Sequence, residues 1–333
     1  MEGFFEVSGL KRSGEECLSI VVPVYREEHS VEPFLERMER VLGGIGMRYE
    51  IIFCLDPSPD RTYEVISSNA DRNPSVKLIQ FSRRFGQPAA TMAGILNCKG
   101  EICVVIDVDL QDPPELIPQM VDKWREGYNV VYAKRRSRRG ETLVKKIVSY
   151  LGYKMINSLT DVKIPVNVGD FRLIDRKVIE ELRKLREKHG FLRGLVAFVG
   201  YRQTFIEYDR DERFAGKGNY NRLLGSLKIG LNGLICFSAR PLQIMALLGF
   251  FVSLAGIVTA IYYFLEKMVF HPDITPGLSS TVIFITIFSG VQLFSLGLIG
   301  EYVSRIYDEV KNRPMYIISE IVDKEPDEPG RQG

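Results

Sequence analysis

Residues 101–115 read EICVVIDVDLQDPPE, an apolar run that ends in an Asp-x-Asp pair and stops at two prolines. A short, continuous apolar run of this kind is typical of a buried strand, which Pro113 and Pro114 cannot extend. The strand therefore presents Asp107 and Asp109 at its carboxyl end. Hard divalent cations prefer oxygen ligands, and Mg²⁺ binds through one or two carboxylates together with phosphate oxygens. The pair predicts a Mg²⁺ or Mn²⁺ site that serves a phosphorylated substrate.

The flanking sequence alternates apolar strands with amphipathic helices. We expect strands at residues 18–25, 50–55, 76–81, 102–106, 129–133 and 168–174, and helices at residues 30–42, 62–70, 89–98, 115–126, 142–159 and 176–188. Strands that are apolar throughout and are separated by helices predict an α/β fold whose mainly parallel sheet is covered on both faces. Ligands bind beyond the carboxyl ends of such strands, so Pro23, Tyr25 and Asp56 are expected in one crevice with the Asp-x-Asp pair.

The composition and the missing motifs narrow the class of protein. The 333 residues carry a net charge of +2, and the basic cluster KRRSRR at residues 134–139 has no interleaved aromatic residues, so we expect no nucleic-acid partner. No Gly-x-Gly-x-x-Gly follows the first strand and no P-loop signature occurs, which argues against both kinds of nucleotide site. The five cysteines have no Cys-x-x-Cys spacing, which favours reduced thiols in a cytosolic domain. The polar residues 1–16 lack the apolar core of a signal peptide.

Two stretches near the C-terminus are long enough to cross a bilayer. Residues 241–265 and 274–300 carry no charged side chain, and ~25 helical residues exceed a hydrocarbon core of about 30 Å. Buried core helices are the alternative. Basic residues flank the outer ends of both stretches, so the positive-inside rule places the catalytic domain and both termini in the cytoplasm. We therefore expect an integral protein of a bacterial inner or plasma membrane.

The residues before these stretches form an amphipathic pattern. Residues 220–237 place leucines on one stripe and basic residues off it, which predicts a juxtamembrane helix on the bilayer surface, with an ordinary surface helix as the alternative. Glycines in both spans could support a homo-oligomer or simply fill small spaces, and the sequence leaves both open. The expected segments are an N-terminal segment 1–17, a catalytic domain 18–212, a juxtamembrane region 213–240, spans 241–265 and 278–300, an external loop 266–277 and a cytoplasmic tail 301–333.

Six motifs along the chain carry a resemblance to a known family. They are VVPVYREE at residues 21–28, FSRRFGQ at 81–87, DVDLQDPPE at 107–115, GDFRLIDR at 169–176, RFAGKGNY at 213–220 and RPMYI at 313–317. With the two spans, they resemble glycosyltransferase family 2, and within it the membrane-anchored polyisoprenyl-phosphate glycosyltransferases of the dolichyl-phosphate mannose synthase and bactoprenol glucosyltransferase type. The resemblance implies a GT-A fold with a Rossmann-like, mainly parallel sheet, a nucleotide-sugar donor and a polyprenyl phosphate acceptor at the bilayer.

The resemblance also implies roles for individual residues. It implies that the nucleotide sugar contacts Pro23, Tyr25, Glu27, Asp56, Arg83 and Asp107. The first four of these residues would hold the base and the ribose. It implies that Asp109 and Gln111 bind Mg²⁺ or Mn²⁺ at the diphosphate. Two motifs depart from the family pattern. Asp56 is followed by Pro-Ser instead of Asp-Gly-Ser, which leaves the choice of nucleotide open, and Gly218-Asn219 replace a hydroxyl residue and a lysine, for which Lys217 could substitute.

An acceptor phosphate needs cations, and several basic residues are candidates. They are Arg136, Arg139, Lys145, Arg172, Arg202, Arg213 and Lys217. The cluster at 134–139 could bind substrate phosphates, attract anionic lipid headgroups or stay solvated. Asp170 is, beside Asp107 and Asp109, a candidate catalytic residue that acts as a base or an orienting group. A structural carboxylate that pairs with Arg172 or caps the following helix is the alternative.

These expectations combine into one predicted function. We expect metal-dependent, inverting transfer of a hexose to undecaprenyl or dolichyl-type phosphate, with UDP-glucose as the leading donor and GDP-mannose, UDP-N-acetylglucosamine and UDP-aminoarabinose also compatible. A processive polysaccharide synthase is disfavoured because the Gln-x-x-Arg-Trp block is missing and two spans are too few for a channel. An inactive membrane scaffold with the same fold is disfavoured by the intact Asp107, Asp109 and Gln111.

Overall fold

The computed structural model describes residues 16–136, 168–185, 187, 192–209, 235, 238–270 and 278–323. The chain divides into two compact units, of which the first contains Met1–Val148, Lys163–Asn221 and Pro314–Gly333 and the second contains Ser149–Val162 and Arg222–Arg313. The first unit therefore takes in residues from both sides of the long apolar segment.

The described residues of the first unit form one sheet of eight strands in the order β7-β5-β6-β4-β1-β2-β3-β8. The strands are β1 (Cys17–Val24), β2 (Arg48–Leu55), β3 (Val76–Phe81), β4 (Ile102–Val105), β5 (Val130–Arg135), β6 (Val168–Asp175), β7 (Gln203–Tyr208) and β8 (Ile318–Val322). β4, β1, β2 and β3 are parallel, β5 is parallel to β7, and β6 and β8 run antiparallel to their neighbours. The carboxyl ends of β4, β5 and β7 therefore point to the same edge of the sheet as those of β1 to β3.

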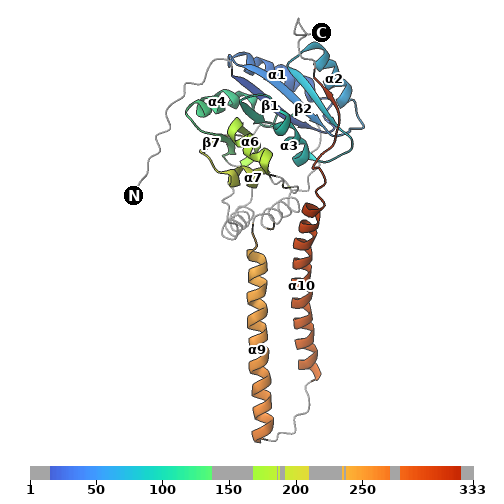
Figure 1. The fold of residues 1–333 in the computed structure, drawn as a ribbon, viewed down its shortest axis with the longest axis vertical. Helices are drawn as coiled ribbons and strands as arrows, with labels where there is room; N and C mark the ends of the chain where they lie inside the picture. Colours follow the sequence, from blue (N-terminus) through green and yellow to red (C-terminus); the bar gives the residue numbers. More distant parts are fainter. Residues whose placement is uncertain are drawn as a thin grey trace, which may run out of the picture. The chain divides into compact units, whose positions relative to one another are not determined.

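Helices cover both faces of this sheet (Figure 1). α1 (Val31–Gly43), α2 (Thr62–Arg72), the short η1 (Pro114–Leu116) and α4 (Ile117–Arg125) supply the core on one face. α3 (Gln87–Asn97), α6 (Arg176–Lys184) and α7 (Leu192–Val199) lie on the other face. α3 approaches so closely that a Cβ on Gly94 would lie 2.2 Å from Cγ1 of Val21. The predicted α/β fold, a mixed and mainly parallel sheet of GT-A type, is confirmed.

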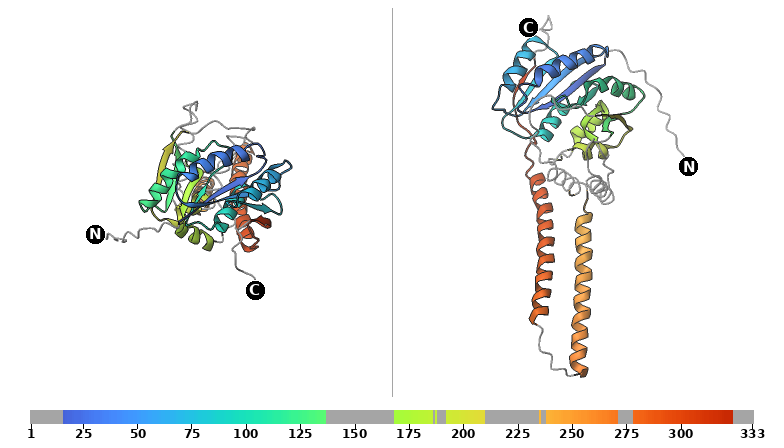
Figure 2. Two further views of the ribbon diagram at one scale, coloured as in Figure 1. Left: turned by 90° about the horizontal axis from the view of Figure 1, so that it is seen from above. Right: turned by 180° about the vertical axis from the view of Figure 1, so that it is seen from behind.

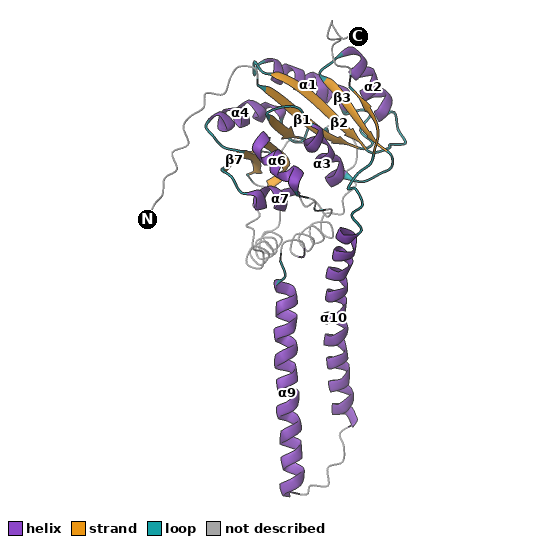
Figure 3. Cartoon of the chain, viewed as in Figure 1, coloured by secondary structure: helices purple, strands orange, loops and turns teal. Residues whose placement is uncertain are grey.

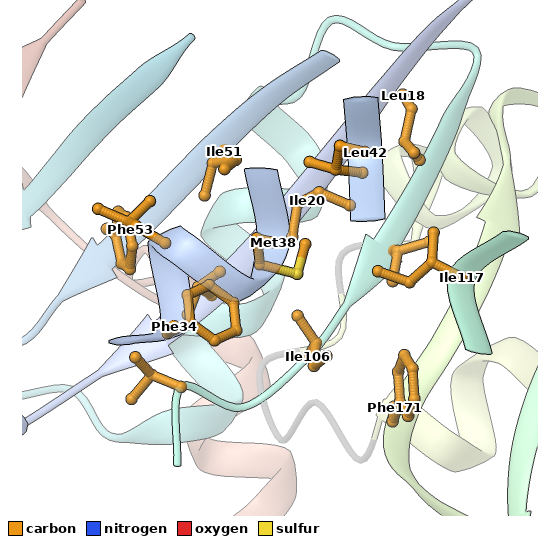
Figure 4. Packing of buried hydrophobic residues seen from close by; sticks show 14 of the residues in the cluster. Leu18, Ile20, Phe34, Met38, Leu42, Ile51, Phe53, Ile106, Ile117 and Phe171 are labelled. Atoms are coloured by element: carbon orange, nitrogen blue, oxygen red, sulfur yellow. The ribbon is translucent and has the colours of Figure 1, made fainter. Parts of the chain in front are cut away.

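The amphipathic pattern of α1 explains why that helix packs on the sheet. Its buried side chains recur at helical spacing and include Phe34, Met38 and Leu42. Phe34 meets Phe53 of β2 edge to face, with ring centroids 6.1 Å apart. Figure 4 shows these side chains together with Ile20 of β1 in one apolar cluster. Burial of this stripe fixes the position of α1, and with it the loop that follows β1.

The second unit contains two long helices, α9 (Arg240–Phe270) and α10 (Leu278–Val310), which run side by side (Figure 2). Within the described residues, Arg240–Thr259 and Ile287–Val310 are long and apolar enough to cross a membrane, and neither stretch is buried within the chain. Exposed apolar surface of this extent argues against buried core helices. Both helices are longer than the predicted spans 241–265 and 278–300, because a helix can continue beyond an apolar stretch into charged residues.

Among the described residues, no neighbour closely approaches the glycines of the two helices. A Cβ at Gly249, Gly256, Gly290, Gly297 or Gly300 would meet no atom within 4 Å. The homo-oligomer that the sequence leaves open therefore stays a prediction.

The sequence pattern does not predict three of the described elements, namely α7, β7 and β8 (Figure 3). β7 and β8 form the two edges of the sheet, and edge strands need not be apolar on both faces. β8 comes from the segment expected as a tail, so the unit that holds the sheet extends beyond the expected boundaries 18–212. Outside the described residues lie the expected helix 142–159, all of the expected helix 220–237 except residue 235, residues 271–277 of the expected loop, and the ends 1–15 and 324–333.

Candidate active site

The strand register brings three predicted residues to one edge of the sheet. Tyr25 follows β1, Asp56 follows β2, and Asp107 follows β4. β1 pairs in parallel with both β2 and β4, and Val24 lies opposite Leu55, so these strands end at the same edge. Ligands of open α/β sheets bind at this edge. The convergence that the sequence predicts is therefore present.

The Asp-x-Asp pair lies in the turn after β4. Asp107 is half-buried, and its Oδ1 accepts a hydrogen bond from Nε2 of Gln87 at 2.9 Å. Asp109 is buried, and its Oδ1 accepts the backbone N–H of Gln111 at 3.1 Å. Leu110 has a φ of 58°, a strained conformation of the kind that collects at functional sites. A side-chain donor from α3 thus holds the first carboxylate, and a backbone donor of the turn itself holds the second.

Asp56 holds the segment of residues 82–87, which runs from the end of β3 to the first residue of α3. Its side chain is buried, and its two oxygens accept the backbone N–H groups of Phe85 at 2.9 Å and of Gly86 at 2.8 Å. Gly86 has a φ of 91°, which residues with a Cβ rarely adopt. Asp56 therefore fixes the loop that carries Gln87 to the Asp-x-Asp turn.

Tyr25 offers an aromatic face beside two cations. The guanidinium carbon of Arg84 lies 4.0 Å from the ring centroid of Tyr25, and that of Arg26 lies 5.3 Å from it. The predicted Arg83 lies instead 4.0 Å from the ring centroid of Phe85. Arg84, which the motifs do not single out, is therefore the loop cation that lies closest to Tyr25. A ring with guanidinium groups beside it can bind a planar base or a phosphate.

The other two predicted donor contacts hold the loop after β1 in place. Pro23 is buried within β1, opposite Cys54. The backbone N–H of Glu27 donates to Oγ1 of Thr62 at 3.0 Å, and its Oε2 accepts the hydroxyl of Ser30 at 2.7 Å. Glu27 therefore joins this loop to the starts of α1 and α2.

Asp170 lies near the Asp-x-Asp turn, because β6 runs antiparallel to β4 with Arg172 opposite Val105. Its Oδ1 accepts a hydrogen bond from Nε of Arg193 at 3.0 Å and lies 3.4 Å from Nη2 of Arg172. Burial opposes the charged form, but Arg193 and Arg172 lower the pKa of Asp170 below its ordinary value. A carboxylate that is held ionised is a weak proton acceptor, so the geometry favours an orienting role over that of a general base.

Arg172 supports Asp170 from inside the sheet. Its side chain is fully buried, and its Nη2 donates to the carbonyl of Gly169 at 2.8 Å. Its Nη1 has no hydrogen-bond partner among the described residues. Burial lowers the pKa of Arg172 from its ordinary value. Arg172 is therefore placed to hold Asp170, since a solvent-facing phosphate could not reach a fully buried guanidinium without rearrangement.

Arg135 is a cation near the site that the motifs do not single out. It ends β5, and its Nη2 lies 3.5 Å from Oδ1 of the buried Asp112. Burial opposes its charge, but Asp112 and, more weakly, Asp107 raise the pKa of Arg135 above its ordinary value. Arg135 in turn lowers the pKa of Asp170. Strand alternation could have found it, because Arg135 follows the buried Ala133 by two residues and so lies on the same face.

The other predicted cations do not join this group in the described part of the chain. Arg136 is 61% exposed, and it lies 3.9 Å from Glu207 and 3.7 Å from Asp209. Arg202 precedes β7, and its guanidinium carbon lies 4.9 Å from the ring centroid of Tyr128. It therefore lies at the amino ends of the strands, whereas the Asp-x-Asp turn lies at the carboxyl ends. The remaining candidates lie outside the described residues: Arg139, Lys145, Arg213 and Lys217.

The donor set of the turn fits a hard divalent cation. Asp107 and Asp109 supply carboxylate oxygens and Gln111 an amide oxygen, which suit Mg²⁺ or Mn²⁺. Among the described residues, no three His, Cys, Asp or Glu side chains are grouped so that they could hold a metal by themselves. The protein would therefore supply part of a coordination shell that substrate phosphates complete, as Mg²⁺ sites commonly require.

Comparison with known proteins identifies the family. The model for "Glycosyl transferase family 2" matches residues 19–183, and the model for "GtrB C-terminal hairpin" matches residues 240–306. An uncharacterized glycosyltransferase of Synechocystis sp. is 45% identical over 91% of this chain and 95% of its own length. The chain belongs to glycosyltransferase family 2.

Further relatives of this glycosyltransferase are more distant. A prophage-derived bactoprenol glucosyl transferase of Shigella flexneri is 36% identical over 90% of this chain and 97% of its own length. Among solved structures, glucosyl-3-phosphoglycerate synthase of Mycobacterium tuberculosis, in complex with Mn²⁺, UDP and phosphoglyceric acid, is 18% identical with a TM-score of 0.45, covering 66% of this chain and 76% of that one.

Proposed function

We propose that this glycosyltransferase transfers a hexose, with glucose from UDP-glucose as the leading donor, to a polyprenyl phosphate of the undecaprenyl or dolichyl type. The proposal depends above all on the convergence of Asp56, Asp107 and Asp109 at the carboxyl ends of parallel strands. It is supported by the similarity to bactoprenol glucosyl transferases over nine-tenths of the chain. The products are a polyprenyl-phosphate sugar and a nucleoside diphosphate.

The donor half of the proposed site consists of the loops after β1, β2 and β3. Tyr25 and Arg84 supply an aromatic face and a cation for the nucleotide, and Asp56 holds the loop that carries Arg84. Asp107, Asp109 and Gln111 would hold the divalent cation, which when bound neutralises charge on a diphosphate. Charge that is placed before the reaction begins is the largest catalytic contribution in most enzymes.

The acceptor half of the proposed site contains Asp170 and its cations. A phosphate monoester is mostly dianionic at neutral pH, so its oxygen can attack the anomeric carbon without losing a proton. The new bond forms as the bond from that carbon to the diphosphate oxygen breaks, the electron pair leaves with the nucleoside diphosphate, and the configuration inverts. Asp170 is then needed to orient Arg193, while Arg135 adds positive charge between the two halves of the site.

We further propose that α9 and α10 cross a bilayer with both ends of the hairpin on the cytoplasmic side. Both ends connect to the same compact unit, since β7 precedes α9 and β8 follows α10. Arg240 begins α9, and Arg305, Lys311 and Arg313 lie at or just beyond the end of α10. This is the charge distribution that the positive-inside rule associates with cytoplasmic ends. Membrane attachment would keep the enzyme at the surface in which its lipid acceptor resides.

Radiolabel transfer tests the proposed reaction. Purified full-length protein with labelled UDP-glucose, undecaprenyl phosphate and Mg²⁺ is expected to produce lipid-extractable label. Parallel reactions with GDP-mannose and UDP-N-acetylglucosamine identify the donor, because the true donor should give the highest kcat/KM. Absence of label from every nucleotide sugar would contradict the proposal and favour the inactive scaffold.

Asp109→Ala tests the role of the Asp-x-Asp pair. We expect the transfer rate to fall about 1000-fold, in the range of losses seen when charge stabilisation of a leaving group is removed. A thermal unfolding scan of the variant checks that the loss is not caused by unfolding. Asp122→Ala, on the outer face of α4, is the matched control and should transfer at the wild-type rate. Wild-type transfer by Asp109→Ala would falsify the metal role.

A further inference from the structure

The chain returns to the sheet after the apolar hairpin and enters β8 beside the donor loop of residues 82–87. β8 pairs antiparallel with β3, with Leu78 opposite Val322, and the register shifts by one residue as β3 reaches Phe81. Such bulges end regular pairing and re-aim side chains next to active sites. At this point the backbone N–H of Ser82 donates to the carbonyl of Ile317 at 3.0 Å. The first residue of the donor loop is therefore bonded to the chain that follows α10.

Tyr316 occupies the space between this strand pair and α3. Its ring centroid lies 5.9 Å from that of Phe81, whose ring lies 6.1 Å from that of Phe85 in the donor loop. Its hydroxyl accepts a hydrogen bond from Nδ2 of Asn97 on α3 at 3.2 Å. Three rings thus connect the post-hairpin segment, the end of β3 and the middle of the donor loop. The RPMYI block, which no step of the proposed reaction uses, contributes the first of these rings.

The donor loop transmits this contact to the site. The backbone N–H groups of Phe85 and Gly86 are the donors that Asp56 accepts, and Gln87 donates to Asp107 at 2.9 Å. A shift of the Phe85 ring would therefore move the backbone that Asp56 holds and the side chain that contacts Asp107. Tyr316 reaches none of the proposed substrate-binding groups directly, so any effect on the donor acts through the loop.

The far end of β8 is fastened separately. Asp323 lies 2.9 Å from Nζ of Lys77 and 3.4 Å from Nζ of Lys99. Lys77 is the second residue of β3, so these ion pairs lie toward the amino end of that strand, away from the donor loop. Changes at Asp323 should therefore loosen β8 without moving Phe85, which makes this end a matched control.

We propose that Tyr316 is a positioning residue for the nucleotide sugar, and that the segment after the membrane hairpin supports the donor loop from behind. This inference rests on the proposed function for the identity of the ligand. It predicts that the affinity for the donor, and not the affinity for the lipid acceptor, depends on the aromatic ring at position 316. The hairpin would then connect at its exit to the loop that binds the soluble substrate.

Steady-state kinetics of the full-length protein in detergent test the proposal. Tyr316→Leu is expected to raise the KM for UDP-glucose about tenfold, a change of about 1.4 kcal/mol, while kcat and the KM for undecaprenyl phosphate stay within about twofold. Tyr316→Phe keeps the ring and loses only the hydrogen bond from Asn97, so it should stay close to the wild type. Asp323→Asn should lower the unfolding temperature at least as much as Tyr316→Leu and leave the donor KM unchanged. An equal rise of donor KM in Asp323→Asn would mean that the effect is general loosening, and the proposal would be wrong.

Hydrogen–deuterium exchange separates this inference from the proposed function. Without any substrate, Tyr316→Leu should speed exchange at the amides of Phe85 and Gly86, and Asp323→Asn should not. Wild-type exchange rates in Tyr316→Leu would overturn the inference whatever the enzyme transfers. If the wild-type protein turned over no nucleotide sugar, the proposed function would fail, and the exchange result would still decide whether Tyr316 holds the loop.

Discussion

The two ends of the central strands both carry charged side chains, but they are built differently. At the amino ends, the buried Glu50 accepts hydrogen bonds from the hydroxyl of Ser19 at 2.5 Å and from the backbone N–H of Lys99 at 2.6 Å, and it pairs with Lys77 at 3.1 Å. Asp323 of the post-β8 segment pairs with the same lysine at 2.9 Å. Opposite charges meet one another here within the chain, and the network fastens strands together.

At the carboxyl ends, similar groups hold loops instead of strands. Asp56 is as buried as Glu50 and also accepts backbone N–H bonds, but its donors belong to the loop that carries Arg84 and Gln87. Arg84 and Gln87 are exposed, and Asp107 is half-buried. A charged cluster therefore becomes a candidate site where loops keep its polar groups accessible to a ligand. The same residue types hold strands together where neighbouring strands enclose them.

After Asp109→Ala, the largest effect on activity at the carboxyl ends is expected from Arg135. Arg135→Lys keeps the charge but not the planar fork that faces Asp112, and we expect kcat/KM to fall about 100-fold. Arg136→Lys, one residue further on and 61% exposed, is the matched control and should change kcat/KM less than about threefold. Measurement of kcat/KM for both variants, with the same donor and the same lipid, shows which of the two arginines the transfer needs. A larger loss in Arg136→Lys would show that the exposed basic cluster carries the phosphate.

A change at the amino ends of the strands should instead lower stability and leave activity almost unchanged. Glu50→Gln leaves Lys77 with less negative charge and disturbs the donors that Glu50 accepts, so the free energy of unfolding should fall by about 2 kcal/mol. The activity per folded molecule should stay within about twofold of the wild type, because this network lies at the far edge of the sheet. Denaturant titration followed by kinetics measures both, and Glu39→Gln on the exposed side of α1 is the control. If Glu50→Gln lowered kcat/KM and left stability unchanged, the proposed difference between the two ends of the strands would be wrong.

The sequence predicts the centre of the sheet better than its edges. β1 to β4 are apolar throughout and end in recognisable loops, so their order and the convergence of Asp56 with Asp107 follow from the pattern. QTFIEY in β7 and ISEIV in β8 mix polar and apolar residues, as edge strands do, and the pattern does not separate them from loops. The missed β7 has a direct consequence. Without that strand, nothing in the sequence shows that Arg202 lies at the amino end of the sheet.

Side-chain direction explains the other differences at the site. In the basic cluster, Arg135 at the end of β5 lies beside Asp112, whereas Arg136, the next residue, lies beside Glu207. A run of basic residues in the sequence does not show which of them face the site. In the donor loop, Arg83 and Arg84 are equivalent in sequence, but Arg84 lies over Tyr25 and Arg83 lies over Phe85. Motif matching identifies the segment, and the local backbone decides which residue contacts which partner.

The smallest expected effect is on the pH dependence of stability, and it concerns Asp170. Arg193 from α7, Arg172 from the same strand and Arg135 from β5 face this carboxylate, and they lower its pKa in the folded protein although burial opposes the charge. A carboxylate whose pKa is lower in the folded than in the unfolded chain stabilises the fold above the unfolded value, near 3.9, and this contribution is lost as the pH falls through the folded value. The wild type should therefore lose free energy of unfolding below about pH 4, and Asp170→Asn should lose less over the same range while starting from a lower value at pH 7. Unfolding titrations of the two proteins from pH 7 to pH 3 measure the difference. Parallel curves would mean that the three arginines do not lower the pKa of Asp170, and the orienting role proposed for it would lose its basis.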